Sequence, residues 1–209
     1  MATTNAYATL TQLRSHLGYQ HDAIGDDAQL ELALNAASRQ IDGYCGRRFW
    51  QDSTLQVREF EAEEWDELEV PVGISTTTGL VVKVDYADNG TFGTTLTLGT
   101  DFLLEPRNAT AETPVWPYCE LEIITSSSNY FPRSAYNRNL VQITAKFGWP
   151  AVPDDVTQAC LIQAAQLAEA KLAVFGAVAL GDSAARSLRA SLNPMAAALV
   201  SPFQRPPVG

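Results

Sequence analysis

Apolar and polar positions alternate with the period of an α-helix in the first part of the chain. The apolar positions form two stripes, Leu10, Leu13 and Leu17 in the first and Leu30, Leu34, Ala37 and Ile41 in the second. Residues three and four apart share one face of a helix, so these stripes predict helices near residues 9–18 and 27–44. Thr9 or Thr11 can cap the first helix, and Asp26 or Asp27 can cap the second.

The second helix is expected to end in the stretch 42–50, which reads DGYCGRRFW. Gly43 and Gly46 occupy positions where a helix C-terminus needs a residue with positive φ. Arg47 and Arg48 complement the negative end of the helix dipole. They can pair with carboxylates of the same subunit or of a neighbouring one.

From about residue 53 to residue 148 the pattern changes to short runs rich in β-branched residues. Seven such runs are separated by turn signals: LQVREFE, LEVPV, LVVKVDY, TTLTLG, DFLLE, CELEIIT and LVQITAKFG. The last run alternates apolar and polar residues with the period of two that a half-buried strand requires. Asn89 and Gly90, between the third and fourth runs, are a hairpin signal. Together the runs predict a β-rich insert of six or seven strands.

Helical spacing returns over residues 153–175, where Pro153 and two acidic residues suit the first turn. The apolar positions of this segment lie on two sides, and its many alanines allow another helix to approach closely. The segment is therefore either the central helix of a monomer core or a helix shared with a neighbouring subunit. The residues expected on the shared side are Ala164, Ala165, Ala168 and Leu172.

The C-terminal arm, residues 176–209, has apolar residues in steps of four, three and four, which is a seam-like repeat. These residues are Leu188, Leu192, Met195 and Leu199. Asn193 and Pro194 suit a helix restart, as cap and first residue, and the final SPFQRPPVG reads as an extended strap. The arm either folds back on its own domain or orders against a partner.

The pattern as a whole predicts an α+β fold in three parts. Residues 1–52 and 149–175 form a helical core, residues 53–148 form the β-rich insert, and residues 176–209 form the arm. A chain of 209 residues with 46% hydrophobic residues is large and apolar enough to bury such a core.

The chain is acidic, with 24 Asp and Glu against 14 Lys and Arg and a formal net charge of −10. Affinity for DNA comes largely from cations that neutralise phosphates, so this composition disfavours a general nucleic-acid binder. Residues 176–209 carry the opposite net charge, with one acidic residue against three arginines. This difference indicates a separate partner for the arm. Neither a membrane span nor a signal peptide is expected, and three widely spaced cysteines make no disulfide framework, so we expect synthesis in a cytoplasm.

The sequence offers little catalytic chemistry. His16 and His21 lie off a common helical face without a cysteine or carboxylate cluster, so neither a metal nor a cofactor is expected. Nucleotide-binding and hydrolase motifs are absent from the sequence. Cys45 could be activated by the two arginines that follow it, but a helix C-terminus disfavours a thiolate and no histidine lies near it in sequence. We therefore expect no enzymatic activity.

Six carboxylates crowd into the stretch FEAEEWDELEV: Glu61, Glu63, Glu64, Asp66, Glu67 and Glu69. This acidic run lacks the spacing of a calcium-binding loop, and a solvated loop of mutually repelling charges is the favoured interpretation. A third use is to lie beside DNA, because an acidic surface repels phosphates and prevents sticking.

A polar segment before the last strand, TSSSNYFPRSAYNRNL, interleaves arginines with aromatic residues: Tyr130, Phe131, Arg133, Tyr136 and Arg138. This composition is typical of contact surfaces for protein or for single-stranded nucleic acid. In an acidic domain a protein partner is favoured. An ordinary long loop with semi-buried aromatic residues is the alternative.

Two stretches resemble a known family: AASRQIDGYCGRRF at residues 36–49 and GWPAVPDDVTQACLIQAAQLA at residues 148–168. With the first helix and the β-rich middle, they are similar to the head-to-tail connector (adaptor, or head-completion) proteins of long-tailed double-stranded DNA bacteriophages. The resemblance implies a structural virion protein, without enzymatic activity, that forms a ring beneath the portal and is typically dodecameric. Such a ring extends the DNA channel, lets DNA pass without specific binding, and offers a surface to the next neck or tail component.

The resemblance also gives each surface an expected role. The C-terminal arm would dock on the portal through an apolar and basic set: Arg186, Leu188, Arg189, Leu192, Met195, Leu199 and Phe203. The alanine-rich helix, with Arg47 and Arg48, would lie between subunits, and the acidic run would face the channel or its rim. The alternatives are another ring of the neck or tail, a host-binding β-module, or an enzyme that uses Cys45.

Overall fold

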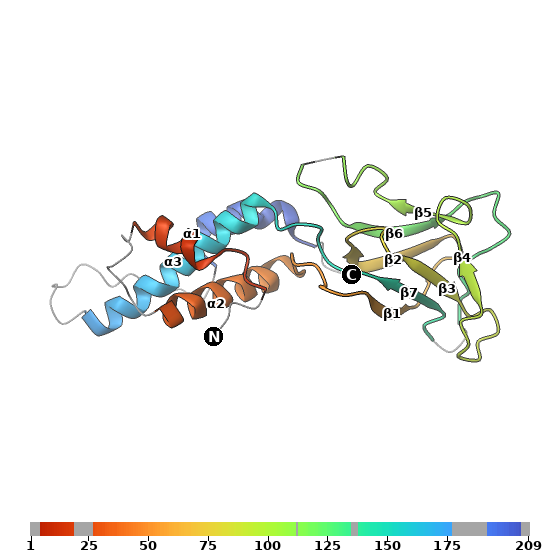
Figure 1. Cartoon of the computed structure of the whole chain (residues 1–209), viewed down its shortest axis with the longest axis horizontal. Coiled ribbons are helices and arrows are strands. Elements are labelled where there is room, and N and C mark those ends of the chain that lie inside the picture. The colour runs from red at the N-terminus through yellow and green to blue at the C-terminus, as the bar shows by residue number, and fades with distance from the viewer. Residues whose placement is uncertain (1–4, 19–26, 112, 135–137, 177–191, 206–209) are drawn as a thin grey trace. The chain divides into compact units, whose positions relative to one another are not determined.

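The computed structural model describes residues 5–18, 27–111, 113–134, 138–176 and 192–205. The chain forms two compact units (Figure 1). Unit 1 comprises residues 1–49 and 152–209, and unit 2 comprises residues 50–151. The described helices lie in unit 1 and the described strands in unit 2, which confirms the predicted α+β class.

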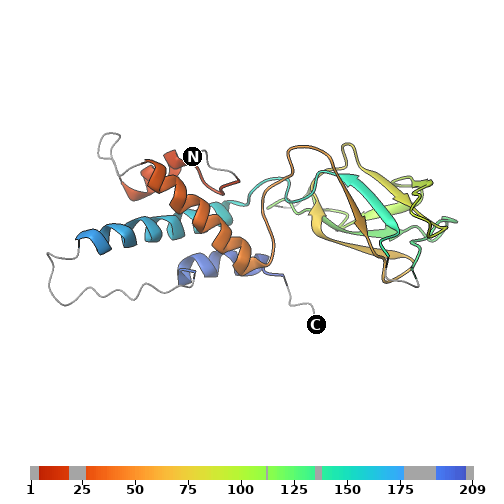
Figure 2. The same ribbon diagram turned by 90° about the horizontal axis from the view of Figure 1, so that it is seen from below.

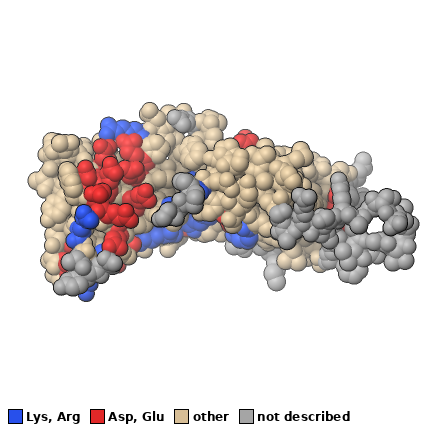
Figure 3. Space-filling view, turned by 180° about the vertical axis from the view of Figure 1, so that it is seen from behind, with Lys and Arg blue, Asp and Glu red and all other residues tan. Residues whose placement is uncertain are grey.

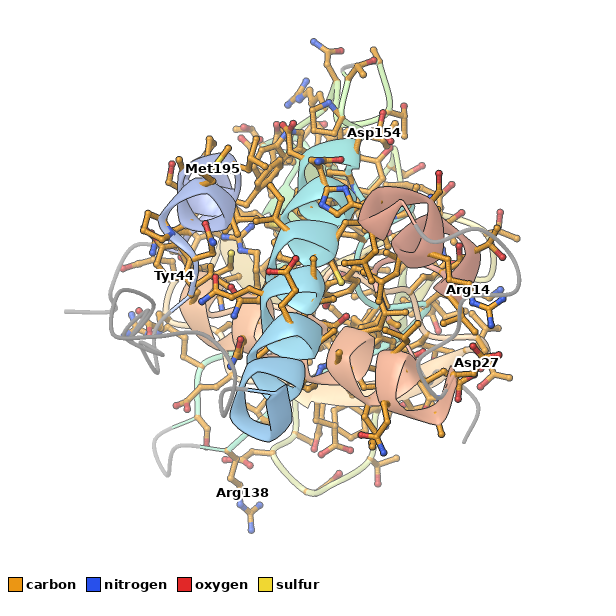
Figure 4. All side chains as sticks on the ribbon, turned by 90° about the vertical axis from the view of Figure 1, so that its left-hand side faces the viewer. Arg14, Asp27, Tyr44, Arg138, Asp154 and Met195 are labelled. Atoms are coloured by element: carbon orange, nitrogen blue, oxygen red, sulfur yellow. The ribbon has the colours of Figure 1, made fainter. Side chains whose placement is uncertain are left out.

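Unit 1 is built around its longest described helix, α3. The described helical elements are α1 (Leu10–Leu17), α2 (Asp27–Cys45), α3 (Asp154–Gly176), α4 (Pro194–Val200) and a 3₁₀ turn, η1 (Ser201–Phe203). α1, α2 and α4 all contact α3, which lies among them in the end-on view of Figure 4 and crosses α2 in Figure 2. A helix packed on several sides must be apolar on more than one of them, which explains the two-sided pattern of this segment.

The ends of α1 and α2 follow from their capping residues. Thr9 forms a capping box with Gln12, because the Thr9 hydroxyl accepts from the Gln12 N–H at 3.2 Å and the Gln12 side chain accepts from the Thr9 N–H at 2.8 Å. α2 runs through Gly43 to Cys45, and Gly46 follows with a φ of +64°. Gly46 therefore turns the chain out of the helix, and the expectation of a positive φ was wrong for Gly43.

The core of unit 1 lies where α2 meets α3. Fully buried residues come from both helices: Leu34, Ala37 and Ile41 from α2, and Val156, Ala159 and Cys160 from α3. The contact brings the Ser38 hydroxyl within 3.4 Å of the Cys160 thiol. Small side chains on α3 allow this close approach, as its alanine content predicted.

Unit 2 consists of two antiparallel sheets, with the strand orders β1-β7-β3-β4 and β2-β6-β5. The strands are β1 (Gln56–Phe60), β2 (Glu67–Ile74), β3 (Val81–Val84), β4 (Thr94–Leu96), β5 (Phe102–Glu105), β6 (Tyr118–Ile123) and β7 (Val141–Ala145). Each of the seven sequence runs forms a strand. Both sheets contribute to one apolar core, in which Val82, Leu121 and Ile143 are fully buried.

The chain leaves unit 2 next to the point where it enters it. β1 pairs with β7, and next to this pair the Asp52 N–H donates to the Phe147 carbonyl at 2.9 Å. Gly148 then passes the Trp50 carbonyl with a φ of +106°, and a Cβ atom on Gly148 would lie 2.1 Å from that oxygen. The two points where the chain enters and leaves unit 2 are therefore neighbours, so α2 and α3 can meet although the whole of unit 2 separates them in sequence.

Replacing Gly148 with alanine should destabilise unit 2 strongly. The new methyl group would have to displace the Trp50 backbone, and the positive φ adds a cost that glycine avoids. We expect the free energy of unfolding to fall by about 3 kcal/mol or more, measured by denaturant titration followed by tryptophan fluorescence.

Gly93→Ala is the matched control, because its φ is ordinary and a Cβ atom there would meet no atom within 4 Å. Its effect should stay within about 0.5 kcal/mol. Equal stability of the two variants would contradict the role given to Gly148.

Candidate functional site

The outer face of the β2-β6-β5 sheet carries a row of glutamates. Glu67 lies opposite Glu122 in the register of this sheet. Glu120 lies in the centre, opposite Glu69 on one side and Glu105 on the other. We call these five residues the glutamate ladder. Residues directly opposite each other have Cβ atoms about 5 Å apart, and like charges at that distance destabilise a sheet.

Glu120 is at the centre of this repulsion. Partial burial raises its pKa, and the charges of the other ladder glutamates raise it further. At the β5 edge the Arg107 guanidinium pairs with Glu105 at 2.6 Å and with Glu122 at 3.4 Å. This cation offsets part of the repulsion, and the face keeps an excess of negative charge.

The acidic run continues the ladder. Residues 61–66 form the loop between β1 and β2, whereas Glu67 and Glu69 belong to β2, so the expectation of a loop was wrong for the end of the run. Seven glutamates line an open hollow here: Glu59, Glu61, Glu63, Glu64, Glu67, Glu69 and Glu120. We call the run and the ladder together the acidic surface, which is the band of acidic side chains over unit 2 in Figure 3.

Sequence reasoning missed Glu105, Glu120 and Glu122, because they belong to strands far from the run in sequence. The alternation CELEI over residues 119–123 could have shown that two glutamates share one face of a strand. It could not have shown which strand lies beside that face. The strand order places β6 between β2 and β5, which brings all five ladder residues together.

In unit 1 the C-terminal segment folds back onto its own helices. Asn193 caps α4, which confirms the predicted helix restart. Its backbone N–H donates to Gln163 at 2.7 Å, and its side-chain amide donates to Gln166 at 2.6 Å. The buried Gln163 in turn donates to Gln40 at 2.8 Å. These amides tie α2, α3 and α4 into one network.

The strap that follows α4 closes the end of α2. The Gln204 side chain donates to the Tyr44 carbonyl at 3.2 Å, and the Arg205 N–H donates to the Cys45 carbonyl at 3.0 Å. These carbonyls lie at a helix C-terminus, where the helix itself offers no partner. The ring of Phe203 is buried edge-on to Phe49, with the centroids 5.7 Å apart.

This packing divides the residues expected to dock on a partner. Phe203 belongs to the core of unit 1, so its place in an outward-facing contact was wrong. Met195 is 69% exposed on the outer side of α4 (Figure 4), and Leu192 and Leu199 are half-buried. The remaining members of the set, Arg186, Leu188 and Arg189, lie outside the described residues.

The residues expected between subunits are divided in the same way. Ala164 is fully buried within unit 1, so no neighbour can reach it and its place in an interface was wrong. Ala165 and Ala168 are half-buried, and the side chain of Leu172 lies outside the described residues. Arg47 and Arg48 are half-buried in the turn after α2.

Cys45 fits the interior of unit 1. Burial raises the pKa of its thiol to about 11, although the charge of Arg47 acts to lower it. The thiol donates to the Val200 carbonyl at 3.7 Å. A buried thiol with a raised pKa is a poor nucleophile.

Among the described residues, no group of three or more His, Cys, Asp and Glu side chains could hold a metal ion. His16 is exposed in α1, and His21 lies outside the described residues. No helix in the described ranges is long and apolar enough to cross a membrane.

The loops of unit 2 present a pair of tyrosines. The Tyr86 and Tyr130 rings lie 4.9 Å apart, and the Tyr86 hydroxyl donates to the Tyr130 carbonyl at 3.1 Å. Phe131 is fully buried, so its place in a partner contact was wrong. Of the other residues predicted in this loop, Arg133 and Arg138 are exposed and Tyr136 lies outside the described residues.

Comparisons with known proteins point to one group. Residues 7–95, which run from before α1 to β4, match the model of the phage gp6-like head-tail connector protein family. The chain is similar to one in the "neck of empty GTA particle computed with C6 symmetry", with 21% identity and a TM-score of 0.56, covering 100% of this chain and 95% of that chain. It is also similar to one in the "virion of native gene transfer agent (GTA) particle", with the same identity and coverage and a TM-score of 0.57. No curated protein matches it in sequence.

Replacing Glu120 with glutamine should stabilise unit 2 at neutral pH. Because the pKa of this carboxyl is raised in the folded state, stability is lost as pH rises from below the ordinary value of 4.5 through the raised one. Glutamine removes the charge and with it this loss. Since Glu120 is only partly buried, we expect a gain of a few tenths to about 1 kcal/mol near pH 7 and none near pH 3, measured by thermal unfolding.

Glu169→Gln, at an exposed position of α3, is the control for this experiment. It removes the same charge away from the ladder and should not reproduce the gain. A Glu120→Gln protein that is less stable than the parent at neutral pH would contradict the repulsion assigned to the ladder.

Proposed function

We propose that this chain, which matches the model of the phage gp6-like head-tail connector protein family over residues 7–95, is a structural protein that joins head to tail in the neck of a phage-like particle. One observation carries the proposal. The family match covers α1, α2 and the first four strands, and a neck protein shares the fold over the whole chain. The family match also confirms the resemblance seen in the sequence.

We infer that copies of the chain assemble into a ring between the portal and the next neck or tail component. The ring extends the channel through which DNA passes. The neck with a similar fold was computed with C6 symmetry, and a dodecameric ring contains that symmetry. In a ring, one surface of each subunit contacts a different surface of the next subunit. Each subunit must therefore offer two different surfaces that complement each other.

In this ring the acidic surface faces the DNA channel or its rim. The ladder holds like charges side by side at a cost to stability, and such local conflicts are expected where a surface has a function. Beside DNA the same charges repel phosphates, so a double strand slides past without sticking. We add Glu105, Glu120 and Glu122 to the proposed channel-facing set, because they lie in the same ladder as Glu67 and Glu69.

The outer side of α4 is the proposed contact with the portal. Met195 is exposed there, with Leu192 and Leu199 beside it in the helical repeat. The segment before α4 adds Leu188 and two arginines. The docking surface is thus apolar with positive charge, and residues 193–205 keep their place on unit 1.

The half-buried side of α3 and the turn after α2 are the proposed contacts between subunits. Ala165 and Ala168 allow a neighbouring helix to approach closely. Arg47 and Arg48 can pair with carboxylates of the neighbour, which an acidic chain supplies in excess.

Other functions fit the observations less well. A host-binding β-module would not need a helical unit, whereas the family match includes α1 and α2. An enzyme that depends on Cys45 would need a reactive thiolate, whereas this thiol is buried and its pKa is raised. A different ring of the neck or tail remains the alternative, and the following experiment separates it from the adaptor.

Substituting both Leu188 and Met195 with aspartate should strongly weaken binding to tail-less capsids that carry a portal. The contact loses the favourable burial of two apolar side chains, and the aspartate carboxylates that replace them must give up their hydration. Because Met195 is exposed, we expect unit 1 to stay folded. Affinity should fall by about a hundredfold, measured by co-sedimentation with emptied capsids.

Leu98→Asp, at an exposed position of unit 2, should leave this binding unchanged. Deleting residues 183–209 would be a poorer test, because it also removes Phe203 and the strap from the core of unit 1. Full binding by the double aspartate variant would exclude the α4 surface as the portal contact and favour another position in the neck or tail.

Replacing Glu69 with lysine should slow the release of DNA from assembled particles. A ring carries one such lysine per subunit, and lysines facing the channel bind phosphates with release of counterions. We expect release to slow by about tenfold at low salt and to recover as salt is raised, followed by a dye that binds free DNA.

Glu169→Lys makes the same charge change on α3 and should not slow release. A reconstruction of the neck in which the glutamate ladder is packed against protein would overturn its assignment to the channel.

A further inference from the structure

Unit 2 exposes aromatic side chains at one end. β1 leads away from the point where the chain enters the unit and β7 leads back to it, so the loops after β1, β3 and β6 lie at the far end. These loops carry Trp65, Tyr86 and Tyr130, which are 54%, 36% and 47% exposed. We call these three side chains the aromatic surface.

Ring and backbone contacts join Tyr86 to Tyr130, and a backbone hydrogen bond ties Trp65 to the residue that follows Tyr130. The Tyr130 N–H donates to the Tyr86 hydroxyl at 3.2 Å, and their rings lie 4.9 Å apart. The Phe131 N–H donates to the Trp65 carbonyl at 2.8 Å. Trp65 and Tyr130 therefore border the same buried residue, Phe131.

Two aspartates hold these loops in place. Asp85 accepts from the backbone N–H groups of Ala87, Asn89 and Gly90 at 3.1, 3.0 and 2.7 Å. Asp101 accepts from the Thr97 N–H, the Ser127 hydroxyl and the Asn129 amide at 2.7, 3.0 and 2.8 Å. A surface ordered in this way before binding loses little conformational freedom when a partner arrives.

The charge around the aromatic surface limits its partners. Glu63, Glu64 and Asp66 flank Trp65, and unit 2 holds 15 acidic residues against six basic ones. Although Arg133 and Arg138 are exposed in the segment that follows Tyr130, the acidic excess of unit 2 repels phosphates, so a nucleic acid is a poor fit. An arginine fits well, because its guanidinium stacks on aromatic rings and pairs with carboxylates through two parallel hydrogen bonds.

We propose that the aromatic surface is the docking site for an arginine-bearing segment of a partner protein. The guanidinium stacks on Trp65 and pairs with the adjacent carboxylates, while apolar side chains of the same segment cover Tyr86 and Tyr130. Rigid Tyr and Trp side chains of this kind dominate the binding energy of many interfaces. The identification of the partner as a neck or tail protein rests on the proposed function. The proposed chemistry of the site does not depend on it.

The test uses the full-length chain and a short synthetic peptide in which arginine and leucine alternate. We expect the parent protein to bind it, and the same peptide with lysine to bind roughly tenfold more weakly, because lysine loses the stacking and the paired hydrogen bonds. The double variant Trp65→Ser/Tyr130→Ser should lose roughly tenfold or more in affinity for the arginine peptide, measured by fluorescence anisotropy of the labelled peptide.

The double variant Val57→Ser/Leu98→Ser is the matched control, because it removes two exposed apolar side chains elsewhere in unit 2. It should bind the arginine peptide like the parent. Equal binding by the Trp65/Tyr130 variant, or equal affinity for the two peptides, would overturn the proposal. The proposal would also be overturned if the parent bound DNA or associated with itself and only the Trp65/Tyr130 variant lost that property. The occupant of the site would then be DNA or a second copy of the chain.

A particle assay separates this proposal from the proposed function. The Trp65→Ser/Tyr130→Ser variant should still form a ring on emptied capsids and should fail to attach the tail. Normal tail attachment would overturn the docking site and leave the adaptor function in place. Absence of any ring with the parent protein would overturn the adaptor function, whereas the peptide result would stand.

Discussion

The pairing of β1 with β7 is the constraint on which the rest of the structure depends. It places the strand that enters unit 2 beside the strand that leaves it, with Gly148 pressed against the Trp50 carbonyl. Because the two crossings are neighbours, the sequence on both sides of unit 2 can build a single helical core from α2 and α3. A side chain at residue 148 would separate them, so a local steric condition supports the fold of the whole chain.

The glutamates on the outer face of unit 2 repel one another and lower its stability. The glutamate ladder places carboxylates opposite one another on three adjacent strands, and Arg107 offsets only the edge nearest to it. The sheet holds together because its inner face is apolar and well buried. In the proposed channel such a face would keep DNA from sticking, which would give the repulsion a functional reason.

The C-terminal segment serves the core and the surface at once. Asn193, Phe203 and the strap bind it to α2 and α3, while Met195 stays exposed on the opposite side of α4. The proposed contact with the portal would need this division, because the subunit would bind a neighbouring ring without loosening its own core. The helical period supplies it, because Ala196 and Val200, four residues apart, lie on the buried side of α4 and Met195 lies on the exposed side.

The sequence by itself determined the elements of this protein. Stripes, caps and β-branched runs are local signals, and they placed α1, α2, α3, the restart at Asn193 and all seven strands close to their observed bounds. It could not determine which surfaces these elements form. Phe131, Ala164 and Phe203 looked suited to contacts, yet each is buried, because burial depends on residues far away in sequence. Only the tertiary structure brought Glu105, Glu120 and Glu122 beside β2 and Tyr86 beside Tyr130, since strand order and loop packing arise from contacts between distant segments, which no local pattern records.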